Sequence, residues 1–102
     1  MAGVGTLLKQ AQKMQKQIES MQASLEAQII DVSSGGGAVQ IKINGAGKFQ
    51  AFTLDADFLQ EDKKFIEETI LQAVQEAALK SKARHEAEMQ KISTGFQLPG
   101  VL

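Results

Sequence analysis

The chain has 102 residues, a formal net charge of −1 at pH 7 and no cysteine. This length predicts one domain with a limited core, and the apolar (43%) and charged (23%) fractions are ordinary for a soluble domain. The lack of cysteine excludes disulfides and thiolate metal sites, and no run of 18 apolar residues exists that could span a membrane. The first ten residues lack the basic and apolar regions of a secretory signal, so we expect a cytoplasmic protein.

The first predicted element is a helix over about residues 6–28. This segment contains no glycine or proline, is rich in good helix formers and has Thr6 as a candidate N-cap. Its apolar residues follow a heptad spacing, which predicts a single packing seam along one side of the helix. The residues of this seam are Leu7, Ala11, Met14, Ile18, Met21 and Leu25.

Three lysines lie almost opposite this seam. At about 100° per residue, Lys9, Lys13 and Lys16 fall within about 60° of one another and form a stripe about 10 Å long. The first 18 residues contain no acidic residue to offset them. The stripe is either a solvated helix face or an anion-binding surface. Surface helices usually mix charges of both signs, which argues against simple solvation.

The middle of the chain, about residues 29–55, has the pattern of a three-stranded antiparallel sheet. The segment IIDV leads into a glycine-rich turn, VQIKIN alternates apolar and polar residues, and Asn44-Gly45 indicates a hairpin that returns through KFQAFTLD. A run of glycines can also cradle a phosphate. Here a strand follows Gly35–Gly37, and the Lys-Ser/Thr pair of a P-loop is missing, so a turn is favoured.

Two phenylalanines in the third strand do not fit strict alternation. Phe49 and Phe52 are three residues apart, which would place them on opposite faces of the sheet. A β-bulge near Gln50 and Ala51 would bring both, together with Leu54, to one face. We expect the phenylalanines to lie mostly in the core.

A second long helix is predicted over about residues 58–92, followed by a tail over 93–102. Asp57 and Gln60 fit a capping pattern, and four acidic residues near the start suit the helix dipole. Its heptad seam opens with apolar residues and then becomes cationic. The seam positions are Ile66, Ile70, Ala73, Ala77, Lys80, Arg84, Ala87 and Lys91.

The length of the second helix bears on the oligomeric state. About 30 helical residues span about 45 Å, whereas a 100-residue globule has a radius of gyration near 13 Å. The helix therefore extends beyond a compact core. The strands and helices also leave a sheet edge and two seams to be covered, for which a symmetric homodimer is the usual solution.

Four segments stand out together: LLKQAQKMQKQIESMQ, INGAGKFQAFTLD, the acidic start of the second helix, and the tail STGFQLPG with Gly95, Leu98, Pro99 and Gly100. In this order and over essentially the whole chain, they resemble the YbaB/EbfC family of bacterial nucleoid-associated proteins. One departure is Ala56, where many family members have proline after the strand; it affects a turn only.

The resemblance implies an α+β fold with a long N-terminal helix, a three-stranded antiparallel sheet and a long C-terminal helix, assembled as a tweezer-like homodimer. It further implies a nucleoid protein that binds double-stranded DNA with weak sequence preference, often encoded near recombination-repair and clamp-loader genes. It does not indicate which cations touch DNA. The two cationic stripes supply the candidates: Lys9, Lys13, Lys16, Lys80, Arg84 and Lys91.

Two other classes of function compete with DNA binding. An enzyme is disfavoured, because His85 is the only histidine, no second histidine of a zinc helix accompanies it and no catalytic triad can be assembled. We therefore expect no catalytic residues, cofactor or metal. The rival interpretation is a coiled-coil adaptor or chaperone-like module whose lysines are merely solvated, without direct DNA contact.

Overall fold

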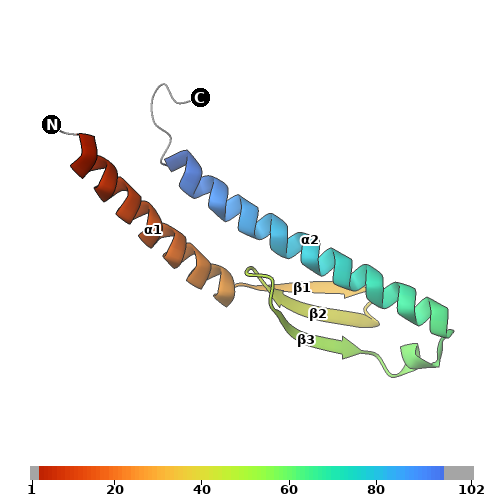
Figure 1. Cartoon of the computed structure of the whole chain (residues 1–102). Coiled ribbons are helices and arrows are strands. Elements are labelled where there is room, and N and C mark those ends of the chain that lie inside the picture. Colours follow the sequence, from red (N-terminus) through yellow and green to blue (C-terminus); the bar gives the residue numbers. More distant parts are fainter. Residues whose placement is uncertain (1–2, 96–102) are drawn as a thin grey trace.

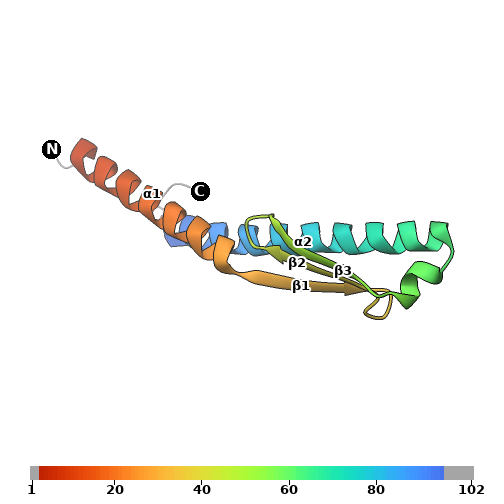
Figure 2. The same ribbon diagram turned by 90° about the horizontal axis from the view of Figure 1, so that it is seen from below.

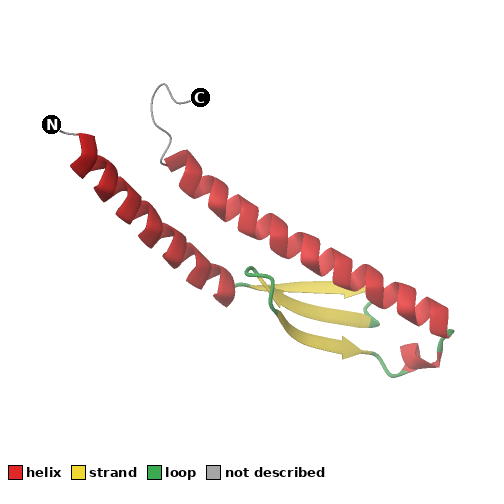
Figure 3. Cartoon of the chain, viewed as in Figure 1, coloured by secondary structure: helices red, strands yellow, loops and turns green. Residues whose placement is uncertain are grey.

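The computed structural model describes residues 3–95, which form two long helices and a three-stranded sheet (Figures 1 and 3). This α+β architecture confirms the predicted fold class. The elements in chain order are α1 (Gly3–Ala27), β1 (Ile29–Ser34), β2 (Val39–Asn44), β3 (Phe49–Leu54), a short 3₁₀ turn η1 (Asp57–Gln60) and α2 (Lys63–Gly95).

Helix α1 starts earlier than predicted. Gly3–Gly5 are themselves helical, so Thr6 lies inside the helix and the prediction that it is the N-cap was wrong. Glycine lowers helix propensity by about 1 kcal/mol relative to alanine, which weakens a helix end without preventing it. Burial along the predicted seam increases toward the C-terminus: Leu7 is exposed, whereas Met21 and Leu25 are buried.

The sheet is antiparallel in the order β1-β2-β3. The pairing of β2 with β3 shifts register between Lys42 and Ile43, and Gln50 is the extra residue of the bulge. Phe49 and Phe52 consequently pair with Ile43 and Ile41 on the same face. The predicted bulge is therefore confirmed. The glycine-rich turn between β1 and β2 is also confirmed, with all three glycines at positive φ.

One face of the sheet forms the core by packing against α2 (Figure 1). Helix α2 lies over β1 and β2, while β3 stays at a free edge with most of its residues exposed. Small residues at Ala73 and Ala77, both fully buried, let the helix approach the strands closely. The buried core residues are Ile30, Val32, Val39, Ile41, Ile43, Phe58, Ala73 and Ala77.

The start of α2 differs from the prediction. Residues 57–60 form the separate turn η1, so Asp57 and Gln60 do not cap the long helix. Asp62 takes that place: its Oδ2 accepts a hydrogen bond from the Lys64 backbone N–H (3.2 Å). The carboxylate of Asp62 thereby satisfies one of the amides that a helix start leaves without a partner.

The molecule is long and thin, with principal extents of 72 × 25 × 15 Å and a radius of gyration of 20.0 Å. Helices α1 and α2 run antiparallel, and Figure 2 shows α1 diverging from α2 toward its N-terminus. Within residues 3–95, neither helix combines the length and the apolarity that crossing a membrane would need. The expectation that the second helix extends beyond a compact core is met, because α2 runs past the end of the sheet (Figure 1).

Gly45 offers a direct test of how α1 is attached. A Cβ at this position would lie 2.7 Å from Leu25 Cδ2 and 3.0 Å from the Leu25 carbonyl oxygen. Gly45→Ala is therefore expected to lower the free energy of unfolding by about 1–3 kcal/mol, as overpacking does. Urea denaturation measures this change.

Gly5→Ala is the matched control, because a Cβ there meets nothing within 4 Å. Inside a helix it should be neutral or stabilise by up to about 1 kcal/mol. Equal unfolding free energies for Gly45→Ala and wild type would show that α1 does not pack on the hairpin as described.

Candidate nucleic-acid interface

Helix α1 projects from the sheet as an arm, and its lysine stripe lies on the solvent side of that arm. Lys9, Lys13 and Lys16 are exposed, and the seam opposite them turns Met21 and Leu25 toward α2 and the hairpin. The stripe therefore points away from α2. Three cations at one turn of spacing on an isolated face suit a polyanion whose charges are regularly spaced.

The candidate cations of α2 each have a partner within the chain. Lys80 lies 3.4 Å from the carboxylate of Glu76, and Lys91 lies 3.2 Å from that of Glu88. These are exposed ion pairs within one helix, worth about 0.3–0.5 kcal/mol each. A phosphate can therefore replace either carboxylate as the partner of its lysine at little cost in free energy.

Arg84 has a different kind of partner. Its Nη1 donates a hydrogen bond to Oε1 of Gln28 at 2.7 Å, which joins α2 to the residue just after α1. Since Lys91 is seven residues beyond Arg84, both lie on the side of α2 that faces α1. The structure thus puts the two predicted cationic stripes on different surfaces of the chain.

Charge is segregated along the long axis of the molecule. Six acidic residues lie at the end formed by η1 and the start of α2, far from the tip of α1 (Figure 1). The acidic set is Asp55, Asp57, Glu61, Asp62, Glu67 and Glu68. Lys63 and Lys64 offset part of this acidic charge. The opposite end, which we call the arm end, carries seven cations, three on α1 and four on α2, against five acids, and so has a small positive net charge. The five acids are Glu19, Glu26, Glu76, Glu86 and Glu88. A net charge of −1 therefore coexists with a basic end.

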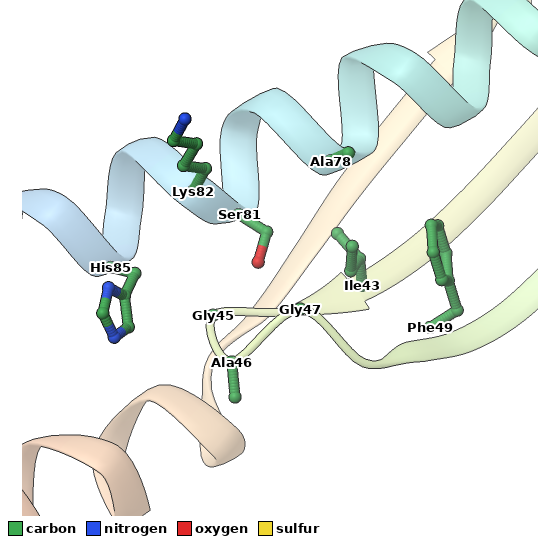
Figure 4. A pocket seen from close by; sticks show the side chains of 9 residues that line it. All are labelled: Ile43, Gly45, Ala46, Gly47, Phe49, Ala78, Ser81, Lys82 and His85. Carbon is green, nitrogen blue, oxygen red and sulfur yellow. The ribbon is translucent and has the colours of Figure 1, made fainter.

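An apolar groove runs between α2 and the exposed inner side of β3. It contains one hollow of about 250 Å³ beside the hairpin and one of about 440 Å³ farther along β3. Figure 4 shows the first hollow, with Phe49 on one side and the α2 residues on the other. We call this the α2–β3 groove; its apolar lining is Ile41, Ile43, Phe49, Phe52, Val74 and Ala78.

The phenylalanines do not lie mostly in the core, contrary to the prediction. Phe58 is buried, but Phe49, Phe52 and Phe65 are about half exposed, and Phe96 lies outside the described residues. The bulge does place Phe49 and Phe52 on the inner face, yet α2 is too narrow to cover a third strand. Two aromatic side chains are thereby left at the edge of the α2–β3 groove.

His85 lines the wall of this groove, beside Ser81 and Lys82 (Figure 4). Within residues 3–95, no cluster of histidine and acidic side chains has the arrangement needed to hold a metal ion. The histidine belongs to the surface next to the hairpin, where it contributes a half-buried polar ring.

Several residues that matter in the structure are not predicted from the sequence. Lys82 is not among the candidate cations, although it lies at the groove (Figure 4). Asn44 is predicted only as part of a turn and Ser81 not at all, yet both are buried and joined by a hydrogen bond. One signal is present in the sequence: Ser81 continues the apolar positions Ala73 and Ala77 at a spacing of four.

The fold and these surfaces define a small α+β protein with a projecting, cation-bearing helical arm. The chain belongs to the YbaB/EbfC DNA-binding family, whose model matches residues 1–96. A nucleoid-associated protein of Ruminiclostridium cellulolyticum is 39% identical over 100 residues, covering 96% of this chain and 87% of the relative. A nucleoid-associated protein of Alkaliphilus metalliredigens is 32% identical over 99 residues, with the same coverage.

A solved structure shares the fold. The crystal structure of the uncharacterized protein HP0035 from Helicobacter pylori matches with a TM-score of 0.71 and covers 95% of this chain and 97% of its own. Its sequence identity is 23%, so this likeness concerns the fold alone.

The ion pairs on α2 predict how acidic neighbours affect DNA affinity. Glu76→Gln removes the partner of Lys80 and one negative charge, so duplex affinity should rise by about 1.7- to 2.3-fold, the equivalent of an exposed pair within one helix. Fluorescence anisotropy at fixed salt measures the change. Glu61→Gln, which removes one negative charge at the acidic end, is the matched control and should leave duplex affinity unchanged. If the two variants changed affinity equally, a local role for Lys80 would be excluded.

Proposed function

We propose that this chain binds double-stranded DNA as a homodimer with weak sequence preference, using the lysine stripe of α1 to contact phosphates. The observation that carries the proposal is the position of that stripe: three exposed lysines on the outer face of an arm with no acid before Glu19. Membership of the DNA-binding family supports the same partner.

The character of the cations supports phosphate contact more than base recognition. Lysine ammonium groups bind phosphates as point charges and carry little base information, so affinity should vary little with sequence. Lys80 and Lys91 are proposed as secondary contacts that exchange their carboxylate partners for phosphates. Because counterion release drives such binding, affinity should fall steeply with salt.

The homodimer is proposed to form through the α2–β3 groove. A single chain leaves Phe49 and Phe52 half exposed beside the unpaired edge of β3, and such an edge with apolar neighbours associates readily. Leu71, exposed on the same side of α2, extends the apolar surface. A second copy presents the same surface, and a two-fold axis along the groove would cover both at once.

The relatives named as nucleoid-associated proteins support a place for this protein in the nucleoid. We propose that it coats or organises DNA there and thereby affects gene expression. Recombination-repair or replication proteins are its proposed neighbours on DNA.

The lysine stripe is tested by replacing Lys9, Lys13 and Lys16 together with glutamine. Glutamine keeps the helix propensity, so the melting temperature should barely change. Duplex affinity should fall for every sequence alike, and the slope of log K against log salt should shrink by about 0.9 for each phosphate that the variant no longer neutralises.

The control carries the same change of charge elsewhere: Lys42, Lys63 and Lys64 replaced by glutamine. These lysines lie on the sheet and at the start of α2. Unchanged binding by the α1 variant, or equal weakening in both variants, would refute direct contact by the stripe. The coiled-coil adaptor would then be the better description.

The dimer is tested with Phe52→Asp. Sedimentation equilibrium at micromolar concentration should give about twice the 11.0 kDa chain mass for the wild type. In the variant the dissociation constant of the dimer should rise at least about 30-fold. Each protomer would bury one unpaired carboxylate in the dimer interface, at a cost of about 1–3 kcal/mol.

Leu59→Asp changes an equally exposed residue of the η1 turn and serves as the control, with the dimer expected intact. A helical wild-type monomer at this concentration would contradict the proposed assembly. So would a Phe52→Asp dimer as tight as that of the wild type.

A further inference from the structure

Three elements meet at Asn44, the last residue of β2: α1 and the hairpin through its side chain, and α2 through its main-chain carbonyl. Asn44 Nδ2 donates to the Glu26 carbonyl of α1 (3.2 Å), and Asn44 Oδ1 accepts from the backbone N–H groups of Ala46 (3.0 Å) and Lys48 (2.9 Å). Ser81 Oγ of α2 donates to the main-chain carbonyl oxygen of Asn44 (2.8 Å). One buried residue therefore connects α1, the hairpin and α2.

The neighbouring glycine completes this attachment. The Gly45 backbone N–H donates to the Leu25 carbonyl at 2.9 Å, and the absence of a Cβ lets the end of α1 rest directly on the hairpin. On the outer side, the Arg84–Gln28 hydrogen bond connects α2 to the same end of α1. We call Asn44, Ser81, Arg84 and Gln28 the arm cluster.

Nothing comparable holds the outer half of α1 within residues 3–95. Residues 3–13 are all exposed, and burial of the seam begins at Met14. The direction of the arm is thus decided at its base. From Gln28 to Lys9 the helix is about 28 Å long, so a tilt of 10° moves Lys9 by about 5 Å. That exceeds the rise of one DNA strand per phosphate along the helix axis, about 3.4 Å.

We propose that the arm cluster fixes the angle between α1 and α2, and that Arg84 acts as a positioning residue through Gln28 instead of binding phosphate. The role of this angle in placing the lysine stripe rests on the proposed function; the geometric claim does not. Arg84 is a candidate for DNA contact on its sequence position alone, and its hydrogen bond to Gln28 assigns it this other task.

The main test is Asn44→Asp, which is nearly isosteric. The carboxylate still accepts from Ala46 and Lys48 and so keeps the turn, but it cannot donate to the Glu26 carbonyl. The angle is read as the distance between spin labels on cysteines introduced at Gln10 and Gln90, both exposed, in a chain without native cysteine. Each labelled variant is diluted with its own unlabelled chain, so that a dimer carries one labelled protomer.

The wild type should give a narrow distance distribution. In Asn44→Asp the mean should shift, or the width should grow, by at least about 5 Å, with helicity retained. Gln50→Glu makes the same amide-to-carboxylate change at an exposed site of the hairpin and should leave the distribution unchanged. An unchanged distribution in a folded Asn44→Asp variant would overturn the proposal.

A second pair of variants decides the case even if Asn44→Asp does not fold. Arg84→Ala and Gln28→Ala should broaden the distribution alike, and the double variant should add nothing, because both remove one link. In Gln28→Glu the carboxylate can still accept a hydrogen bond from Arg84, so this variant should keep the wild-type distance distribution. Wild-type distributions in both alanine variants would refute the role of this pair.

DNA binding separates this inference from the proposed function. Arg84→Ala and Gln28→Ala should weaken duplex binding to a similar degree with an unchanged salt slope, because Arg84 neutralises no phosphate. A slope smaller by about 0.9 in Arg84→Ala alone would show phosphate contact and overturn the positioning role. If the label distances respond but no variant or wild type binds DNA, the proposed function fails and the arm cluster stands.

Discussion

The buried amide of Asn44 is the interaction on which the arrangement of the arms depends. Burying an amide costs several kcal/mol unless its donors and acceptors are satisfied, and every fully buried side-chain polar atom in residues 3–95 has a partner. For Asn44 those partners come from the end of α1 and from its own hairpin, while its carbonyl binds Ser81 of α2. Moving α1 removes the partner of Asn44 Nδ2, and moving α2 removes the partner of the Ser81 hydroxyl, so each movement breaks a hydrogen bond of a buried residue. A two-layer fold only 15 Å thick therefore keeps a defined geometry despite its small core.

The second constraint is geometric: one helix cannot cover three strands. Strands are about 4.8 Å apart and a helix is about 10 Å wide, so α2 covers β1 and β2 and leaves the inner side of β3 open. The bulge at Gln50 increases this mismatch, because it turns both Phe49 and Phe52 to the inner face. In a monomeric protein, charged residues would be expected to protect this open edge. The half-exposed aromatics are instead what a two-fold interface would bury.

Much of the fold could be predicted because its signals are local. Heptad spacing gave both helices, alternation gave β2, and the spacing of two aromatics gave the bulge. The wrong predictions concern tertiary or end effects. Thr6 has the residue type of an N-cap, but the glycines before it are already helical. Asp57 fits the N-cap pattern for α2, but Asp62 lies next to the start of that helix and caps it instead. The arm cluster could not be derived, because it joins residues as far apart as Gln28 and Arg84, and no local pattern in the sequence encodes that contact.

Segregated charge explains how an acidic chain can belong to a DNA-binding family. Fields of opposite sign at the two ends of a 72 Å molecule act separately, since the Debye length is about 8 Å at physiological salt. DNA approaching the arm is therefore screened from the acidic end, while DNA approaching the body is repelled. In the proposed function, this polarity would orient the encounter, with the ends of α1 and α2 toward the duplex and the surface formed by η1 and the start of α2 away from it. If DNA binds through the lysine stripe as proposed, the angle between α1 and α2 at Asn44 decides how many phosphates the lysines of α1 can reach together.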